Sequence, residues 1–277
     1  MRLGLMVGPE RGRCATKVER MLGDAKWAQD NGLSSIWIPQ IPDEFDAMTA
    51  AALVAHSTSR IEIGTAVVAL QTRHPVALVQ QALSTQLVAE GRFTLGVGPS
   101  HHWIVQDMLG LPYDRPAALT ADYLDVIDAA MAGPGVVEIT NDSFRINNPM
   151  YVTDAPRMPV LLAALGPVML RLAGSRTDGT ILWLADEKAI ESHIAPRIHE
   201  AAASTSSWRA VRAPGPCGLV SPGSGGPGPG SCALVPTVGR FGPQVCHRMS
   251  RNPRHPVTRP GRGETSGDSA RPRRDIR

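Results

Sequence analysis

The stretch GRFTLGVGPSHH at residues 91–102 decides the fold class. Phe93 to Val97 form a short apolar run that predicts a buried strand, and a glycine turn follows it directly. Upstream, His74 and Pro75 open an apolar-periodic helix that Gly91 closes, and proline at the start with glycine past the end is typical of a helix. The stretch therefore predicts one complete β-α connection.

The same alternation extends over residues 1–203. Further strand-like runs lie at 3–7, 35–39, 61–70, 159–163 and 180–184, and helix-like segments lie at 17–31, 47–57, 123–131, 169–173 and 188–203. Residues 136–154 hold turn residues between apolar pairs and predict a hairpin inserted after the fourth unit.

Six repeated β-α units predict a parallel sheet, because parallel neighbours need crossover helices. Two α/β layouts fit the pattern, an open doubly wound sheet and a closed (β/α)8 TIM-barrel-like fold. Six units with room for two more favour the barrel.

Residues 204–277 follow different composition rules from residues 1–203. The first part holds 16 Lys and Arg against 22 Asp and Glu, whereas the second holds 12 Arg, no Lys, 3 acidic residues, 11 Pro and 12 Gly. Such a composition predicts disorder. One interpretation is a reading-frame shift near 204–207 in a GC-rich gene, which would leave an inactive truncated enzyme. The other is a basic tail that binds nucleic acid or another polyanion without catalysis. Resequencing the gene separates the two.

Several classes of protein lose support from the sequence. No apolar run reaches the roughly 18 residues of a membrane span, and the apolar start of the chain is too short for a signal peptide, so we expect a cytoplasmic protein without membrane contact. Cys217, Cys232 and Cys246 match no zinc spacing, and Cys14 stands alone. The sequence has no GxSxG, no P-loop and no GxGxxG followed by an acidic residue, which disfavours hydrolases and nucleotidases.

Chemistry is expected at the carboxyl ends of the strands, where ligands of both layouts bind. The turns at 96–100 and 164–167 are rich in small residues and open helical segments, whose free N–H groups favour an anion. Two such turns on one rim indicate a phosphate-bearing cofactor, while either turn alone is a tight connection. His101 can serve there as acid, base or hydrogen-bond donor, or simply cap the loop with His102. Trp37 and Trp183 either flank a planar ring or belong to the core.

Several ordered blocks resemble a known family. They are IEIGTAVV (61–68), RHP (73–75), GRFTLGVGPSHH (91–102), LPYDRPA (111–117), PVLLAALGPVMLRLAG (159–174) and DGTILWL (178–184). Together they are similar to the luciferase-like monooxygenase superfamily, and most closely resemble an actinobacterial branch of coenzyme F420-dependent oxidoreductases. The resemblance covers nearly all of residues 1–203.

The resemblance implies a TIM-barrel-like fold, hydride transfer between the deazaflavin of F420 and a small organic substrate, and a non-proline cis peptide at Ala66–Val67. It also implies a seventh and an eighth strand within 204–277, where the sequence has none, so the barrel is expected to be incomplete, with these strands missing or replaced. An FMN-dependent monooxygenase on the same fold is the alternative, a homodimer is compatible with either, and no nucleic acid is expected at the barrel. His101 is the candidate catalytic residue. The implied cofactor contacts are Thr65, Ala66, Val67, Gly96, Gly98, Pro99, Ser100, Ala164, Leu165, Gly166 and Pro167.

The chain departs from the sugar-phosphate dehydrogenases of this superfamily at two places. Gln40 and Ile41 stand where those enzymes carry an acid–histidine pair, and His101 stands where they carry a glutamate. That specific dehydrogenase activity is therefore not expected.

Overall fold

The computed structural model describes residues 3–8, 16–152 and 154–204. All of them belong to one of the chain's two structural units, Met1–Gly239. The expectations for residues 205–277, including the frame shift and the polyanion-binding tail, and those for the four cysteines lie outside the described residues.

The described strands of the main sheet are parallel and follow the order β1-β2-β3-β5-β8-β9, with β4 also pairing with β5. Their bounds are β1 Gly4–Met6, β2 Ser35–Ile38, β3 Glu62–Thr65, β4 Val68–Ala69, β5 Phe93–Gly98, β8 Val160–Ala163 and β9 Gly179–Ile181. A doubly wound sheet reverses its strand order at a switch point, and this sheet does not. The arrangement is that of an incomplete TIM-barrel-like fold.

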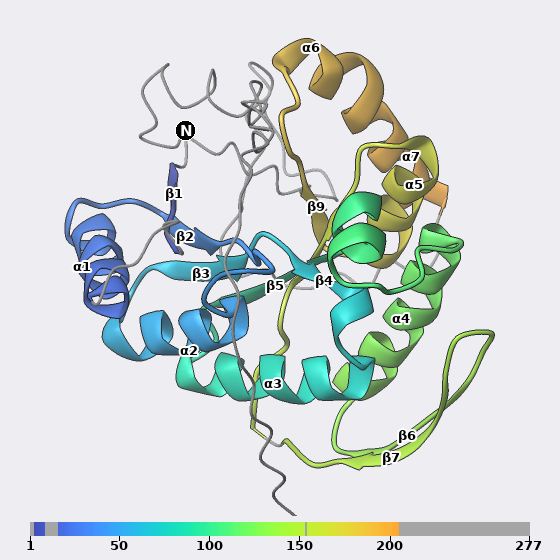
Figure 1. Cartoon of the computed structure of the whole chain (residues 1–277), viewed down its shortest axis with the longest axis horizontal. Coiled ribbons are helices and arrows are strands. Elements are labelled where there is room, and N and C mark those ends of the chain that lie inside the picture. The colour runs from blue at the N-terminus through green and yellow to red at the C-terminus, as the bar shows by residue number, and fades with distance from the viewer. Residues whose placement is uncertain (1–2, 9–15, 153, 205–277) are drawn as a thin grey trace, which may run out of the picture. The chain divides into compact units, whose positions relative to one another are not determined.

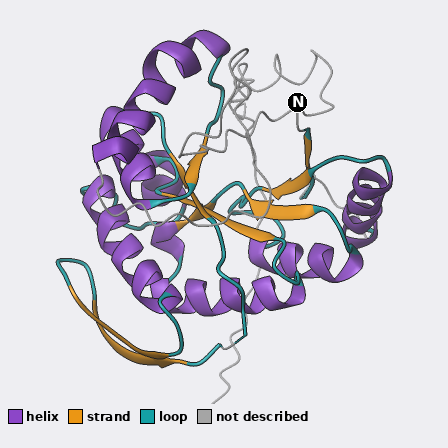
Figure 2. Cartoon of the chain, turned by 180° about the vertical axis from the view of Figure 1, so that it is seen from behind, coloured by secondary structure: helices purple, strands orange, loops and turns teal. Residues whose placement is uncertain are grey.

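Helices follow the strands and cover the outer side of the sheet (Figures 1 and 2). Their bounds are α1 Lys17–Asp30, α2 Ala47–Ser57, α3 Pro75–Val88, α4 Pro116–Met131, α5 Pro167–Arg176, α6 Glu187–Ala189 and α7 Ala195–Ser204. Shorter helical turns are the 3-10 turn Leu70–Thr72 and the π-helical turns Ile104–Met108 and Ile190–Ile194. The six predicted β-α units are confirmed.

Side chains of the strands divide between two apolar clusters, as the period of two requires. One set, which includes Ile63, Leu95 and Leu162, packs in the large cluster with residues of the helices. Trp37, Leu161 and Ile181 form a separate cluster with Ala66 and Val67. The sheet is thus covered by apolar side chains on both faces, as expected for parallel strands.

The predicted insertion is a hairpin of β6 Gly135–Thr140 and β7 Arg145–Met150, and it stands apart from the main sheet (Figure 1). Its turn carries Phe144, whose ring meets Tyr123 of α4 edge-on at 5.7 Å and His74 at 5.8 Å. These ring contacts fix the hairpin to α4 and to the residue that caps the start of α3.

Four predicted elements differ clearly from the structure. The helix predicted at 123–131 begins earlier, at Pro116. The run 61–70 is not one strand, because the ladder breaks between β3 and β4. The strand predicted at 180–184 ends at Ile181, and Leu184 adopts a positive φ of 55°. The helix predicted at 188–203 begins at Glu187, where Asp186 accepts a hydrogen bond from the Ala189 N–H, and is interrupted by the π-helical turn.

Candidate functional site

A break in the sheet marks the carboxyl end of the third strand. The peptide bond between Ala66 and Val67 is cis, as the resemblance implies. Pairing with β5 runs to Gly64 and resumes at Val68. Across the gap, the Thr65 hydroxyl donates to the Gly96 carbonyl (2.8 Å) and accepts from the Gly96 N–H (2.9 Å). Thr65 is fully buried, so its side chain replaces the missing ladder bonds.

The glycines of β5 are required by neighbouring strands. A Cβ on Gly96 would lie 1.9 Å from the Thr65 carbonyl oxygen and 2.5 Å from Ile181 Cδ1. A Cβ on Gly98 would lie 2.8 Å from the Cβ of Ala163. Because protein atoms already exclude a side chain, these two glycines are explained by packing, whether or not a cofactor approaches them.

Aromatic side chains of the following loop contact the turn after β5. Ser100 has a positive φ of 58°, and its carbonyl accepts a hydrogen bond from the Tyr113 hydroxyl (2.9 Å). Burial raises the pKa of Tyr113. His101 is exposed, and its ring stacks on Trp103 with centroids 6.2 Å apart, while His102 meets the Tyr113 ring edge-on. His101 is thus open to a ligand from the rim.

The corner after β8 differs from the turn after β5. Gly166 is the N-cap of α5 with φ −82°, no side chain caps the helix, and nothing lies within 4 Å of a Cβ built on Gly166. Pro167 is the first helical residue, and Leu165 is exposed. The first-turn N–H groups of a helix have no intrahelical partner. This corner therefore has both the space and the donors to take an anion.

Two residues from the segment after β9 support this corner. His193 Nε2 lies 3.0 Å from the Leu165 carbonyl oxygen, which can only accept, so Nε2 carries the proton. Arg197 donates to the carbonyl of His193 (2.7 Å). Sequence reasoning missed both residues, because their relation to Leu165 depends on how the π-helical turn Ile190–Ile194 and α7 pack beside α5.

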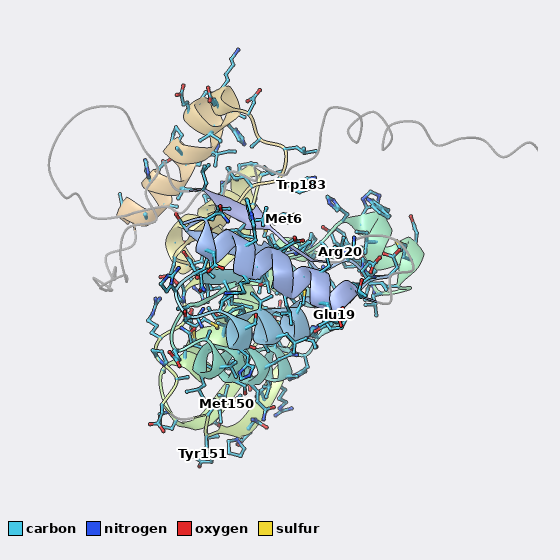
Figure 3. The ribbon with its side chains drawn as sticks, turned by 90° about the vertical axis from the view of Figure 1, so that its left-hand side faces the viewer. Met6, Glu19, Arg20, Met150, Tyr151 and Trp183 are labelled. Carbon is cyan, nitrogen blue, oxygen red and sulfur yellow. The ribbon has the colours of Figure 1, made fainter. Side chains whose placement is uncertain are left out.

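The two candidate tryptophans have different positions. Trp37 is buried, donates to the Ser35 hydroxyl (2.9 Å), and covers Gly64, whose Cβ would lie 2.2 Å from the Trp37 ring. Trp183 follows β9 and is 53% exposed. In the side view of Figure 3, Trp183 lies far from Tyr151, which follows the hairpin. Trp37 is a core residue, whereas Trp183 borders the carboxyl end of the sheet.

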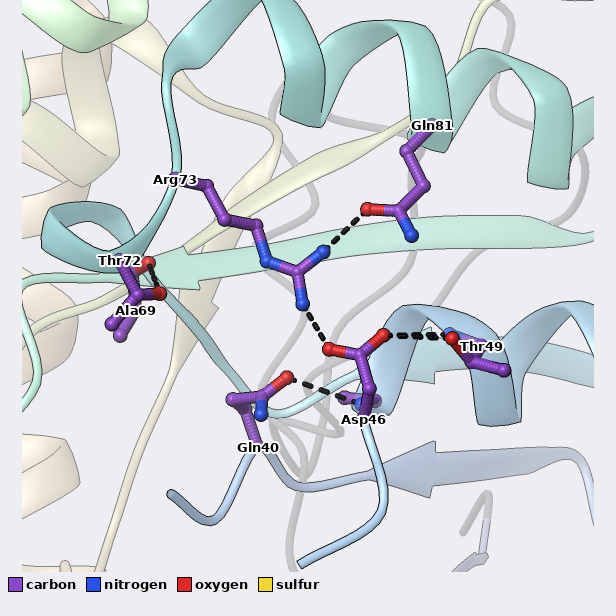
Figure 4. Close-up of polar contacts among 8 residues, drawn as sticks. Gln40, Asp46, Thr49, Ala69, Thr72, Arg73 and Gln81 are labelled. Atoms are coloured by element: carbon purple, nitrogen blue, oxygen red, sulfur yellow. Dashed lines mark hydrogen bonds and ion pairs between the residues drawn. The ribbon is translucent and has the colours of Figure 1, made fainter. Parts of the chain in front are cut away.

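The RHP segment (73–75) makes polar contacts that hold the loops at the carboxyl end of the sheet. Figure 4 shows the contacts of Arg73. Arg73 forms an ion pair with Asp46 and donates to Gln81. Asp46 is also the N-cap of α2, and its carboxylate accepts from the Thr49 N–H (2.9 Å). His74 caps α3 through its Nδ1, which accepts from the Val76 N–H (3.3 Å).

One polar side chain at this end lacks partners. Gln71 lies in the 3-10 turn between β4 and α3, and its Oε1 and Nε2 are both buried without a hydrogen bond among the described residues. The sequence places a glutamine there but gives no sign that its amide is unpaired.

The structure brings the predicted segments 65–67, 96–100 and 164–167 together. Ala69 pairs with Gly98 in the ladder, and Gly98 in turn faces Ala163 of β8. The described residues contain no group of three or more His, Cys, Asp or Glu suited to a metal ion. In the same part of the chain, no helix is long and apolar enough to span a membrane.

The family model for luciferase-like monooxygenases matches residues 1–215. The chain belongs to the luciferase-like monooxygenase family. It is 27% identical over 167 residues to a 5,10-methylenetetrahydromethanopterin reductase of Methanolobus tindarius, covering 60% of this chain and 51% of the relative. It is 28% identical over 170 residues to a putative coenzyme F420-dependent oxidoreductase of Mycobacterium tuberculosis, covering 57% and 48%. The chain spans about half the length of these curated relatives.

Two solved structures share the fold. The coenzyme F420-dependent tetrahydromethanopterin reductase of Methanopyrus kandleri superposes with a TM-score of 0.61 at 25% identity, covering 73% of this chain and 61% of the reductase. A Baeyer–Villiger monooxygenase from Pseudomonas putida, in complex with FMN, superposes with a TM-score of 0.62 at 18% identity, covering 74% and 63%. Proteins that share this fold are therefore described with either cofactor, F420 or FMN.

Proposed function

We propose that the protein is an F420-dependent oxidoreductase that moves a hydride between the deazaflavin ring and a small organic substrate. The main support is the Ala164–Pro167 corner, an uncapped helix start with open space at Gly166, in a chain similar to a putative coenzyme F420-dependent oxidoreductase and to a coenzyme F420-dependent reductase. When bound, the cofactor supplies the hydride chemistry, and the protein supplies binding and orientation.

The phosphate of the cofactor would bind at the start of α5. The N–H groups of the first turn and the helix dipole favour an anion there. A side chain at Gly166 would occupy the space that the phosphate needs, although it would meet no protein atom. His193 would fix the corner by holding the Leu165 carbonyl. The chemistry of this donor set fits the phosphate that F420 and FMN share.

The face of the ring would lie against the bulge at Ala66–Val67. Both residues are partly exposed, apolar and small to medium in size, and Thr65 keeps the broken ladder hydrogen-bonded behind them. His101, on the exposed rim, would donate a hydrogen bond to the ring or exchange a proton with the substrate. The bulge therefore shapes the site, and the rim loop contributes the titratable group.

An FMN-dependent monooxygenase is the second candidate. It is favoured by the FMN complex that shares this fold, because the phosphate corner accepts either cofactor equally well. The two candidates share every cofactor contact proposed above. They differ in the ring of the cofactor, which is a deazaflavin in F420 and a flavin in FMN.

A titration of the full chain with F420 and with FMN tests the function. F420 is expected to bind more tightly than FMN. The reverse order would assign the FMN-dependent class. Failure of both cofactors to bind a folded sample would contradict the proposal.

A further inference from the structure

Gln29 and Gln86 are buried at the amino end of the sheet, and Gln71 is half-buried at the carboxyl end, where its amide is paired differently. Gln29 Oε1 accepts from the N–H groups of Ser59 (2.7 Å) and Arg60 (2.9 Å), just before β3. Gln86 Oε1 accepts from the Phe93 N–H (2.8 Å), and its Nε2 donates to the Arg157 carbonyl (3.4 Å). Both therefore join helices to the amino ends of strands.

Gln71 at the carboxyl end has no such partners. Its Oε1 and Nε2 are buried and unpaired within the described residues. An unpaired buried amide is costly, because the water it bonded in the unfolded chain is not replaced. Such groups are rare in folded proteins and need an explanation, such as a ligand or an ordered water.

The position of Gln71 favours a ligand. Val68 and Leu70 pack in the cluster with the helices, whereas Val67 packs with Trp37 and its neighbours on the other face. Two residues before Gln71, Ala69 pairs with Gly98, which begins the turn that carries Ser100. Gln71 thus lies beside two of the segments that form the proposed cofactor site.

The turn that carries Gln71 is held from both sides (Figure 4). The Thr72 hydroxyl donates to the Ala69 carbonyl (3.0 Å), and Arg73 is held by Asp46 and Gln81. A side chain on a fixed turn loses little additional freedom when it binds, which is the arrangement expected of a binding residue.

We propose that the Gln71 amide binds the edge of the cofactor ring that carries a carbonyl next to an N–H. A carboxamide offers one acceptor and one pair of donors side by side, so it is satisfied by a partner with the same two functions. A phosphate or carboxylate would leave Oε1 unpaired. The pyrimidine-dione ring of a flavin or deazaflavin carries this edge, and the inference therefore rests on the proposed function.

Methylation of the ring tests the contact without changing the protein. The probe is F420 or FMN, whichever the wild-type chain binds, compared with the same compound methylated at N3. The wild type should bind the methylated ring at least about tenfold more weakly, because a single lost hydrogen bond to a buried partner has this effect. Equal affinity for the two rings would overturn the proposal.

The variant Gln71→Met completes the test, since methionine is similar in length and apolar. Without ligand, its melting temperature should rise by about 3 °C, because an unpaired amide is removed. It should also no longer distinguish the two rings. The control Gln86→Met should melt below the wild type and keep the discrimination. A fall in the melting temperature of Gln71→Met, or discrimination retained by it, would overturn the proposal.

Failure of the proposed function can be distinguished from failure of the Gln71 contact. In that case the wild type binds neither F420 nor FMN, whereas failure of the Gln71 contact alone leaves cofactor binding intact and insensitive to N3 methylation.

Discussion

The two ends of the sheet differ in how their polar groups are used. At the amino end, Arg92 donates to the carbonyls of Ala55, Thr58 and Ile61 and to the Thr58 hydroxyl, with its Nε alone left unpaired within the described residues, and Gln29 and Gln86 bind backbone groups. At the carboxyl end, α5 begins without a side-chain cap and the Gln71 amide is unpaired. A polar group that is already paired stabilises the fold, whereas an unpaired one at a binding site can be paired by a ligand. Variants at the amino end should therefore change stability, and variants at the carboxyl end should change binding.

The largest stability effect is expected for Arg92→Met at the amino end. The variant loses four hydrogen bonds from a half-buried guanidinium and leaves three carbonyls unpaired, so the free energy of unfolding should fall by about 3 kcal/mol. Urea unfolding measures it. Arg145→Met, on the exposed hairpin, is the control and should change stability by less than about 0.5 kcal/mol. If folded Arg92→Met bound the cofactor more weakly than the wild type, the expectation that the amino end affects stability alone would be wrong.

Thr65, beside the bulge at Ala66–Val67, is an exception, because it lies at the carboxyl end and stabilises the fold. Thr65→Val removes the hydroxyl that serves both backbone groups of Gly96, and the free energy of unfolding should fall by about 2 kcal/mol. Thr65→Ser keeps the hydroxyl and should retain most of that stability. If the valine and serine variants unfold at the same urea concentration, the hydroxyl does not close the ladder.

Gly166→Ala should separate binding from stability. The added methyl meets no protein atom, and alanine is a somewhat poorer N-cap than glycine, so stability should fall by no more than about 1 kcal/mol. Cofactor affinity should fall about tenfold, since the methyl occupies the space proposed for the phosphate. Gly23→Ala, which also has open space but lies in the interior of α1, is the control and should leave affinity unchanged. Unchanged affinity in Gly166→Ala would exclude a phosphate at this corner.

The smallest effect concerns Tyr113 and alkaline pH. Burial raises the pKa of Tyr113 above its usual value, so its neutral form, which donates to the Ser100 carbonyl, contributes stability below about pH 10. That contribution is lost as the pH rises through the raised pKa. The difference in unfolding midpoint between wild type and Tyr113→Phe should therefore shrink above about pH 10. A difference that stays constant across this range would contradict the coupling.

Much of this fold could be predicted because local signals agree with it. His74 and Pro75 mark the start of α3, and the cap and the first helical residue lie there. The end of β9 could not be predicted, because ILWL (181–184) is apolar throughout while pairing with β8 stops at Ile181. The exposure of Trp183 follows from the same early end.

The site could be predicted only in outline. The segments that meet at the carboxyl end are visible in the sequence, but glycines that look alike differ in cause: Gly96 is required by Thr65 and Ile181, whereas Gly166 meets nothing. His193 and Gln71 were missed because their roles depend on contacts, or the lack of them, that only the folded chain has.

Hydrogen exchange of the full chain, with and without F420, tests most directly whether the carboxyl end of the sheet is the binding end. Added F420 should slow exchange in the segments 66–73, 96–102 and 164–170 and leave the segments around Gln29, Gln86 and Arg92 unchanged. Protection confined to the amino end, or none at saturating F420 and FMN, would contradict the account.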